Sequence, residues 1–131
     1  MKIRGLVIAG VLVLAGSARG EERSRQNEVD NFVAQVREGL DKRLVDYPSA
    51  RFKDVRISTD LKYACGEVNS RNQMGGMTGW APFYGVPETD GVRIAVTHLL
   101  PEIQAGARED CGPSARVWLP QDFSEALKFR D

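Results

Sequence analysis

The sequence is poor in the side chains that most often carry catalysis or bind metal ions. Its 131 residues include one histidine, His98, and two cysteines, Cys65 and Cys111. One imidazole and no Cys-x-x-Cys pair leave few ligands for a zinc site and little basis for a nucleophile–base pair. We therefore interpret His98 as a residue at the end of a strand rather than a catalytic base, and we expect no enzymatic activity, no metal and no cofactor.

The sequence also lacks an excess of charge of either sign. It has 18 lysines and arginines against 18 aspartates and glutamates. Loss of residues 1–20 would remove three basic residues and no acidic one, which leaves 15 against 18. Because the positive and negative charges are nearly balanced, the sequence gives no reason to expect nucleic acid or an anionic membrane as a partner.

A long hydrophobic run is missing as well. The longest run, residues 6–15, is too short to span a membrane, which takes about twenty apolar residues. Lys2 and Arg4 precede this run, and small residues follow it. A charged start, a short apolar run and a small-residue exit are typical of a secretory signal peptide.

The end of this segment predicts where the mature protein starts. Cleavage after Gly20 fits the small-residue pattern, and cleavage after Ala18 is the alternative. Ser17 stands where a bacterial lipoprotein signal has its lipid-bearing cysteine. We expect residues 1–20 to be a signal peptide and residues 21–131 to be one domain, periplasmic or secreted and without a membrane anchor.

Export changes how the two cysteines are interpreted. In an oxidising compartment, an even pair such as Cys65 and Cys111 most simply forms a disulfide. Because the bridge would close a long loop, it would stabilise the fold by about 4 kcal/mol through loop-closure entropy. A redox site and a metal site are the alternatives, but neither cysteine belongs to a Cys-x-x-Cys pair.

Apolar residues at three- and four-residue steps predict one amphipathic helix after a frayed polar lead-in at residues 21–26. Asn27 is a suitable N-cap, and Pro48 moves Tyr47 out of helical geometry. Gly39 inside the helix costs about 1 kcal/mol relative to alanine, which favours close packing there. The predicted apolar face consists of Val29, Phe32, Val33, Val36, Leu40 and Leu44.

Alternating apolar and polar residues predict a sheet after the helix. A tight connection, one helical turn at most, is expected at residues 46–52. The predicted strands cover residues 55–58, 63–69, 77–84 and 92–99. A turn is predicted at residues 58–60, loops at residues 70–76, 85–91 and 101–113, and a short edge strand at residues 117–119.

The last segment predicts a short helix that opens at Pro120 and places Phe123, Ala126 and Leu127 on one side. A helix followed by consecutive strands with short links predicts the α+β class. The expected fold is an N-terminal amphipathic helix packed on a small antiparallel sheet of about four strands, with one disulfide and a short C-terminal helix.

Two stretches carry a resemblance to a known family, residues 46–56 (DYPSARFKDVR) and residues 65–83 (CGEVNSRNQMGGMTGWAPF). They are similar to a family of small exported proteobacterial proteins, many of them predicted lipoproteins, with the patterns DPxSAxF and CGxxNxxNxxGGxxGxxPF. This chain departs from the family in placing Tyr47 between the aspartate and the proline, and in lacking the lipid-bearing cysteine. The resemblance implies a shared fold and compartment, and it assigns no catalytic residue.

The same central stretch, residues 65–83, is where a binding site is predicted. Its glycines could cradle an anion, but they more simply supply a positive φ in a hairpin loop. Two roles are open for Asn69 and Asn72. Their side-chain amides either bind a ligand or form hydrogen bonds with the nearby backbone and hold a turn.

Three further side chains complete the predicted site. Glu67 lies two residues from both Cys65 and Asn69 and so shares their strand face, either solvated or as part of a polar site. Trp80 and Tyr84 lie together on one side of their strand, either in the core or as an exposed aromatic patch.

Three classes of function follow from these alternatives. An interaction module of the cell envelope, for example an inhibitor or accessory of an envelope enzyme, would expose the predicted site. A structural or stress-related envelope protein would bury it and bond it internally, and an enzyme would need Glu67 or His98 in a cleft. We expect the first, with an envelope protein as partner and a site formed by Glu67, Asn69, Asn72, Trp80 and Tyr84.

Overall fold

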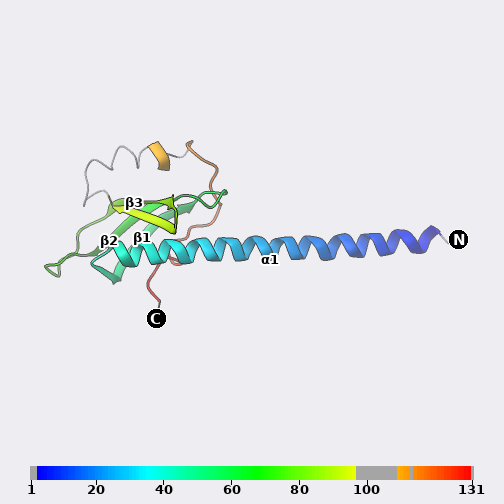
Figure 1. The fold of residues 1–131 in the computed structure, drawn as a ribbon, viewed down its shortest axis with the longest axis horizontal. Coiled ribbons are helices and arrows are strands. Elements are labelled where there is room, and N and C mark those ends of the chain that lie inside the picture. Colours follow the sequence, from blue (N-terminus) through cyan, green and yellow to red (C-terminus); the bar gives the residue numbers. More distant parts are fainter. Residues whose placement is uncertain (1–2, 97–108, 113, 131) are drawn as a thin grey trace. The chain divides into compact units, whose positions relative to one another are not determined.

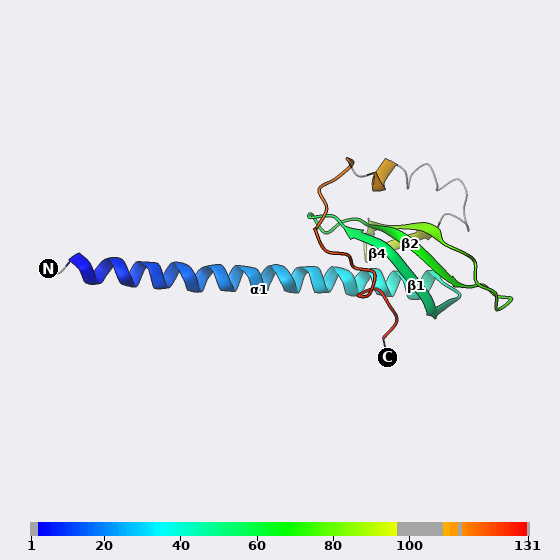
Figure 2. The same ribbon diagram turned by 180° about the vertical axis from the view of Figure 1, so that it is seen from behind.

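A computed structural model describes residues 3–96, 109–112 and 114–130. In chain order these residues form a helix and four strands, α1 followed by β1 to β4 (Figures 1 and 2). The chain divides into two units, residues 1–31 and residues 32–131. His98, the end of the predicted fourth strand and most of the loop predicted at residues 101–113 lie outside the described residues.

Helix α1 runs from Ile3 to Arg43, so the predicted helix is present and begins earlier than expected. The prediction of a frayed lead-in at residues 21–26 was wrong, because its charged residues favour helix and add side-chain pairs such as Gln26–Asp30 at 2.9 Å. On the predicted apolar face, Val33 is half-buried. The other members are buried: Val29, Phe32, Val36, Leu40 and Leu44.

The strands form one antiparallel sheet in the order β1-β2-β3-β4. Each strand therefore pairs with its neighbours in sequence, which short connections favour. The bounds are Asp46–Ile57 for β1, Ala64–Arg71 for β2, Ala81–Glu88 for β3 and Gly91–Val96 for β4.

In the second unit, α1 packs on one face of this sheet. A Cβ added at Gly39 would lie 2.7 Å from the carbonyl oxygen of Val92 and 2.9 Å from Cγ1 of Ile94. The same face carries the ring of Phe83, which meets Phe52 edge to face at 5.8 Å. The predicted α+β fold, a helix on an antiparallel sheet, is confirmed. Its core is completed by Val36, Leu40, Ala64, Val68 and Val96.

The opposite side of the sheet is called the outer face here. Because side chains alternate along a strand, β2 presents Cys65, Glu67, Asn69 and Arg71 on this face. Glu67 thus shares a strand face with Cys65 and Asn69, as its spacing predicted.

The prediction of a tight connection at residues 46–52 was wrong, because β1 begins at Asp46. The pairing of β1 with β2 is shifted between Asp46 and Arg51, so Pro48 lies in an irregular part of the strand. Proline is tolerated there because no ladder hydrogen bond needs its missing N–H. The helix itself ends before Pro48, with Leu44 N–H donating to Leu40 O at 2.8 Å.

The third strand lies four residues later than predicted, at Ala81–Glu88 instead of residues 77–84. Met77 makes only an isolated bridge with Arg71, and the regular ladder starts where Ala81 meets Val68. The loop predicted at residues 85–91 shrinks to a two-residue turn, because Glu88 already pairs with Gly91. The positive φ of Gly91, 134°, suits this tight hairpin.

The C-terminal segment covers the edge of β1. Leu119 N–H donates to Ile57 O at 2.8 Å, and Phe123 N–H donates to Val55 O at 3.1 Å. The edge strand predicted at residues 117–119 is a single bridge between Ser58 and Trp118.

The predicted short C-terminal helix is one turn. Leu127 N–H donates to Phe123 O at 3.1 Å, and both side chains are buried. Tyr47 in β1 holds this turn in place, because its hydroxyl donates a hydrogen bond to Leu127 O.

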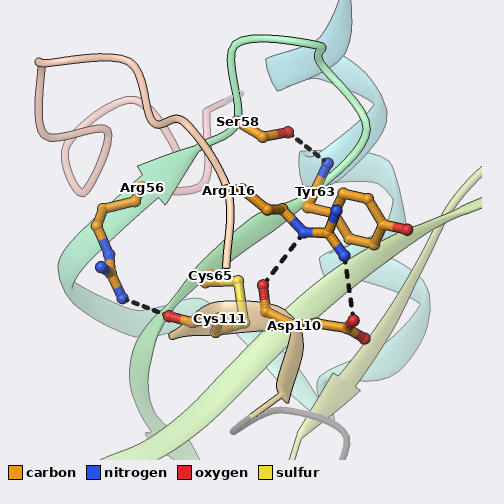
Figure 3. The surroundings of a disulfide bond; sticks show 7 residues. All are labelled: Arg56, Ser58, Tyr63, Cys65, Asp110, Cys111 and Arg116. Atoms are coloured by element: carbon orange, nitrogen blue, oxygen red, sulfur yellow. Dashed lines mark hydrogen bonds and ion pairs between the residues drawn. A yellow bond between two sulfur atoms is a disulfide. The ribbon is translucent and has the colours of Figure 1, made fainter. Parts of the chain in front are cut away.

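The predicted disulfide joins Cys65 of β2 to Cys111. Figure 3 shows two arginines that fix the segment around Cys111. Arg56 donates to Cys111 O at 3.0 Å, and Arg116 donates to Asp110 O at 3.2 Å and pairs with its carboxylate at 3.1 Å. No helix in the described part of the chain combines the length and apolar character needed to cross a membrane.

Candidate functional site

The hairpin loop, defined as residues 72–80, connects β2 to β3 and extends past the end of the sheet (Figures 1 and 2). Asn72 organises it: its side-chain Oδ1 accepts hydrogen bonds from Met74 N–H at 2.9 Å and Gly76 N–H at 3.2 Å. Two backbone hydrogen bonds close the same turn: Asn72 N–H donates to Gly76 O, and Gly75 N–H donates to Asn72 O. Gly75 has a φ of 84°, which favours glycine.

Asn69 fixes the return of the loop toward the sheet. Its Oδ1 accepts a hydrogen bond from Gly79 N–H at 3.0 Å, and Thr78 N–H donates to Ser70 O at 2.9 Å. Gly79 also has a positive φ, 83°. Both asparagines therefore use their side-chain oxygens to hold the loop, which is the turn-forming alternative that the sequence left open.

The loop presents its large apolar side chains to solvent. Met74 at its tip is 93% exposed, Met77 46% and Trp80 43%. Side chains of this size are normally buried, where each contributes about 1.5–3 kcal/mol. Three of them in nine residues, on a backbone held by hydrogen bonds, form an apolar surface that is available for contact.

Glu67 and Trp80 meet through a residue that the sequence did not single out. Lys53 of β1 lies opposite Glu67, and its ammonium is 3.8 Å from the Glu67 carboxylate. The same ammonium lies 4.5 Å from the centre of the Trp80 ring, within the range of a cation–π contact. Lys53 therefore joins the carboxylate on the outer face to the base of the hairpin loop.

Tyr84 stands apart from this group. It lies in β3, opposite Cys65 on one side and Ala95 on the other. Together with Arg93 and Asp110, Tyr84 lines an open cavity of about 780 Å³. The structure thus brings together four of the five predicted site residues, and places Tyr84 near the disulfide.

A second open cavity, of about 340 Å³, lies beside the loop and is called the cationic groove. Its cations come from three elements: Arg51 from β1, Arg71 from β2, and Lys128 from the segment after the C-terminal turn. Apolar walls are supplied by β1 and by the hairpin loop. The residues that define the groove are Pro48, Ser49, Ala50, Arg51, Arg71, Met77 and Lys128.

Hydrogen bonds made by Ser49 and Tyr47 set the position of the groove. Ser49 Oγ donates to Asp46 O at 2.8 Å and accepts a hydrogen bond from Arg71 N–H at 3.1 Å. Tyr47 holds Leu127, the residue before Lys128. Burial raises the pKa of Tyr47 above its usual range, and a hydrogen bond from Arg37 acts in the opposite direction. Tyr47 is therefore neutral at ordinary pH, and its hydroxyl can donate a hydrogen bond to Leu127 O.

The surroundings of the disulfide have a structural character. Arg116 stacks 3.3 Å from the centre of the Tyr63 ring (Figure 3). Arg56 lies 5.0 Å from the centre of the Trp118 ring. The carbonyl oxygens of Asp110 and Cys111 accept hydrogen bonds from these same arginines. Among residues 3–96, 109–112 and 114–130, no group of three or more histidines, cysteines, aspartates and glutamates could hold a metal ion.

Sequence reasoning missed Lys53, Met74, Met77 and the three cations of the groove, Arg51, Arg71 and Lys128. It placed Met74 in the loop predicted at residues 70–76, where the pair Gly75–Gly76 is a turn signal, but it did not identify this side chain as part of a site. Lys53 has no such signal, because its approach to Glu67 depends on the register between β1 and β2.

Comparisons of the chain with known protein families, with curated proteins and with solved structures found no match.

Proposed function

We propose that this protein is an exported interaction module that binds a protein partner of the cell envelope through its hairpin loop. The observation that carries the proposal is the exposure of Met74, Met77 and Trp80 on this loop. Exposed apolar side chains that gather in one place mark surfaces for protein contact, and tryptophan is enriched among the residues that dominate binding energy.

The hydrogen bonds of the loop support this proposal. A flexible loop loses conformational entropy when it binds, and each ordered side chain costs about 0.5–1.5 kcal/mol. Because Asn69 and Asn72 already hold the backbone, little of that cost remains for binding. Full burial of Met74 at an interface would add roughly 1.5–3 kcal/mol of favourable free energy.

Export is supported by the N-terminal segment and by the disulfide. Residues 1–20 have the composition of a signal peptide, and the bridge between Cys65 and Cys111 persists most readily in an oxidising compartment. The resemblance of residues 46–83 to small exported proteobacterial proteins agrees with the same location. A periplasmic or secreted protein is therefore part of the proposal.

A structural envelope protein is the second candidate function. The internal hydrogen bonds of Asn69 and Asn72 favour it, because those amide oxygens serve the fold. The exposure of Met74, Met77 and Trp80 on one loop argues against it, since a purely structural loop needs no group of large apolar side chains in water.

Site-specific photocrosslinking in living cells tests the proposal. A benzoylphenylalanine placed at Met74 in the full chain should give a discrete adduct with an envelope protein. The matched control is Val117, which is 71% exposed but lies far from the loop in sequence. A Trp80→Ala change, confirmed to be folded, should abolish the adduct at position 74. Equal labelling from positions 74 and 117, or no adduct from position 74, would contradict an interaction through the loop.

A further inference from the structure

The cationic groove gathers positive charge from segments far apart in the sequence. Arg51 lies opposite Asn69 in the sheet, and Arg71 follows Asn69 by two residues on the same strand face. The two arginines are therefore neighbours on the outer face. Lys128 closes the groove from the C-terminal segment.

These two arginines differ from the two that lie beside the disulfide. Arg56 and Arg116 bind backbone carbonyls and stack on aromatic rings. Among the described residues, neither Arg51 nor Arg71 has an acidic side chain within salt-bridge distance, and both are exposed. Their guanidinium groups are thus free to bind an anion from outside.

Lys128 adds a third cation whose partner is easily displaced. It pairs with Glu125 at 3.0 Å, but the Glu125 side chain is 83% exposed. Exposed pairs of this kind contribute little to stability, so a better-placed anion can compete for the ammonium.

The groove also has apolar walls. Met77 belongs to both the groove and the exposed apolar surface of the hairpin loop, and Pro48 lies on the β1 side. A ligand that fills the groove and touches the loop must therefore carry an anionic group beside an apolar one. A guanidinium binds a carboxylate through two parallel hydrogen bonds, which gives such a contact direction as well as strength.

We infer that the groove is a carboxylate-binding site that takes an aspartate or glutamate side chain from an extended acidic and apolar segment of a protein partner. The inference rests on the proposed function, and it adds the chemistry that the partner must present. The apolar side chain beside that carboxylate packs on Met77 and Met74, while Arg51 and Arg71 bind the carboxylate itself.

The outer face disfavours an anionic bilayer as the ligand. Glu67 lies on this face, with its side chain 35% exposed, and would face the phosphates of a flat membrane. A protein segment avoids this repulsion, because it can place a neutral or basic residue opposite Glu67. The groove is also concave, and a protruding side chain fills a hollow better than a flat surface does.

Titration of the isotope-labelled protein with synthetic peptides tests the inference. The probe is a blocked heptapeptide of alternating glutamate and leucine, and the control peptide replaces each glutamate with glutamine. We expect saturable shifts of the backbone amide signals of Arg51, Arg71 and Met77 with the glutamate peptide, and an affinity at least about fivefold lower for the glutamine peptide.

Two double variants of equal charge separate the groove from the general field of the protein. Arg51→Gln with Arg71→Gln should weaken binding of the glutamate peptide about tenfold. Lys62→Gln with Arg93→Gln removes the same charge from exposed positions outside the groove, and it should leave the affinity within about twofold. Equal weakening by both double variants would overturn the inference. Retained amide spectra show that each variant is folded.

Two further probes give the remaining outcomes. Inorganic phosphate that saturates the same signals, while the glutamate peptide causes no shift, would make the groove a phosphate site and overturn the inference. Binding to phosphatidylglycerol vesicles that depends on Arg51 and Arg71, again without peptide binding, would make it a membrane site and overturn it too.

The photocrosslink at Met74 distinguishes this inference from the proposed function. If the adduct forms equally well with Arg51→Gln and Arg71→Gln, the loop binds its partner without the groove, so the function stands and the inference fails. If benzoylphenylalanine at position 74 gives no adduct in the chain that keeps both arginines, the proposed function fails.

Discussion

The hydroxyl of Tyr47 links the start of β1 to the C-terminal turn and so fixes one wall of the cationic groove. The side chain is buried, and its ring meets Phe52 and Phe129 edge to face at 6.4 and 5.6 Å. The hydroxyl donates to Leu127 O, a buried contact between residues 80 positions apart in the chain. One side chain thus holds the last segment of the protein on the sheet.

A Tyr47→Phe change keeps the ring and removes this hydrogen bond. It leaves the Leu127 carbonyl without its donor, so we expect the free energy of unfolding to fall by about 1–3 kcal/mol. Urea unfolding of the native protein and the variant measures the difference. Tyr84→Phe, in a half-buried tyrosine of β3, is the matched control and should change stability by less than about 0.5 kcal/mol. Equal effects of the two changes would show that the hydroxyl of Tyr47 contributes nothing.

Asp122 makes the stability of the C-terminal turn depend on pH. Hydrogen bonds from the side chain and backbone N–H of Ser124, at 2.5 and 2.9 Å, and from Val55 N–H at 3.3 Å lower the pKa of its carboxyl below the usual value. A pKa that is lower in the folded state than in the unfolded one means that the carboxylate stabilises the fold above the unfolded pKa, and that this stability is lost as pH falls through the folded one.

We therefore expect Asp122→Asn to lower the free energy of unfolding at pH 7. The difference between variant and native protein should shrink as the pH falls below about 4, near the pKa of an unfolded aspartate, and vanish once the native carboxyl is protonated. Urea unfolding at a series of pH values measures it. A difference that stays constant from pH 7 to pH 2 would assign the effect of Asp122 to its shape rather than to its charge.

At the scale of elements, the contact between α1 and β4 depends on the absence of one side chain. Gly39 would be unfavourable in a helix on propensity alone, by about 1 kcal/mol relative to alanine. The close approach of Val92 O and Ile94 explains why glycine stands there.

Gly39→Ala is accordingly expected to destabilise the protein despite its better helix propensity. An added Cβ 2.7 Å from a backbone oxygen must push α1 away from β4, which we expect to cost about 1–3 kcal/mol. The midpoint of thermal unfolding should fall. Gln35→Ala, at an exposed position of the same helix, is the control and should have little effect. A higher midpoint for Gly39→Ala would mean that the helix can shift without loss.

The elements also show how far a sequence pattern can be followed. The apolar stripe of α1 and the alternation in β2 and β4 were predicted, because both report which face is buried. The boundaries of β1 and β3 were not. Pro48 and Pro87 favoured loops in the sequence. In the structure, Pro48 lies in an irregular part of the edge strand β1, and Pro87 of β3 pairs with Val92 of β4. The tolerance for a proline depends on which neighbour needs its N–H, and pairing alone decides that.

At the scale of the whole second unit, the disulfide holds the segment around Cys111 on the outer face of the sheet. It joins residues separated by 46 positions, and Cys65 is buried within β2. Arg56 and Arg116 bind the neighbouring backbone, so the bridge is one of several contacts that fix this segment (Figure 3).

Replacement of both cysteines by alanine is expected to lower the free energy of unfolding by about 2–5 kcal/mol, mainly by releasing a long loop in the unfolded state. Urea unfolding measures the loss, and the native protein treated with dithiothreitol should lose a similar amount. Peptide mapping without reduction should recover Cys65 joined to Cys111. Two free thiols in the protein purified from its native compartment would refute the bridge.

Local chemistry along the chain accounts for the amphipathic part of α1 after Asn27, for the pairing of the only two cysteines, and for a central stretch rich in turn-forming residues. These features were predictable because periodicity, an even cysteine count and glycine content act over a few residues or leave a single choice. The exposure of Met74, the approach of Lys53 to Glu67 and Trp80, and the cationic groove were not predictable in this way. They depend on strand register and on the fold of the C-terminal segment, which brings Lys128 to Arg51 and Arg71. A shift of β1 by one residue in register would move Arg51 and Lys53 to the other face of the sheet, so three-dimensional pairing determines the candidate site.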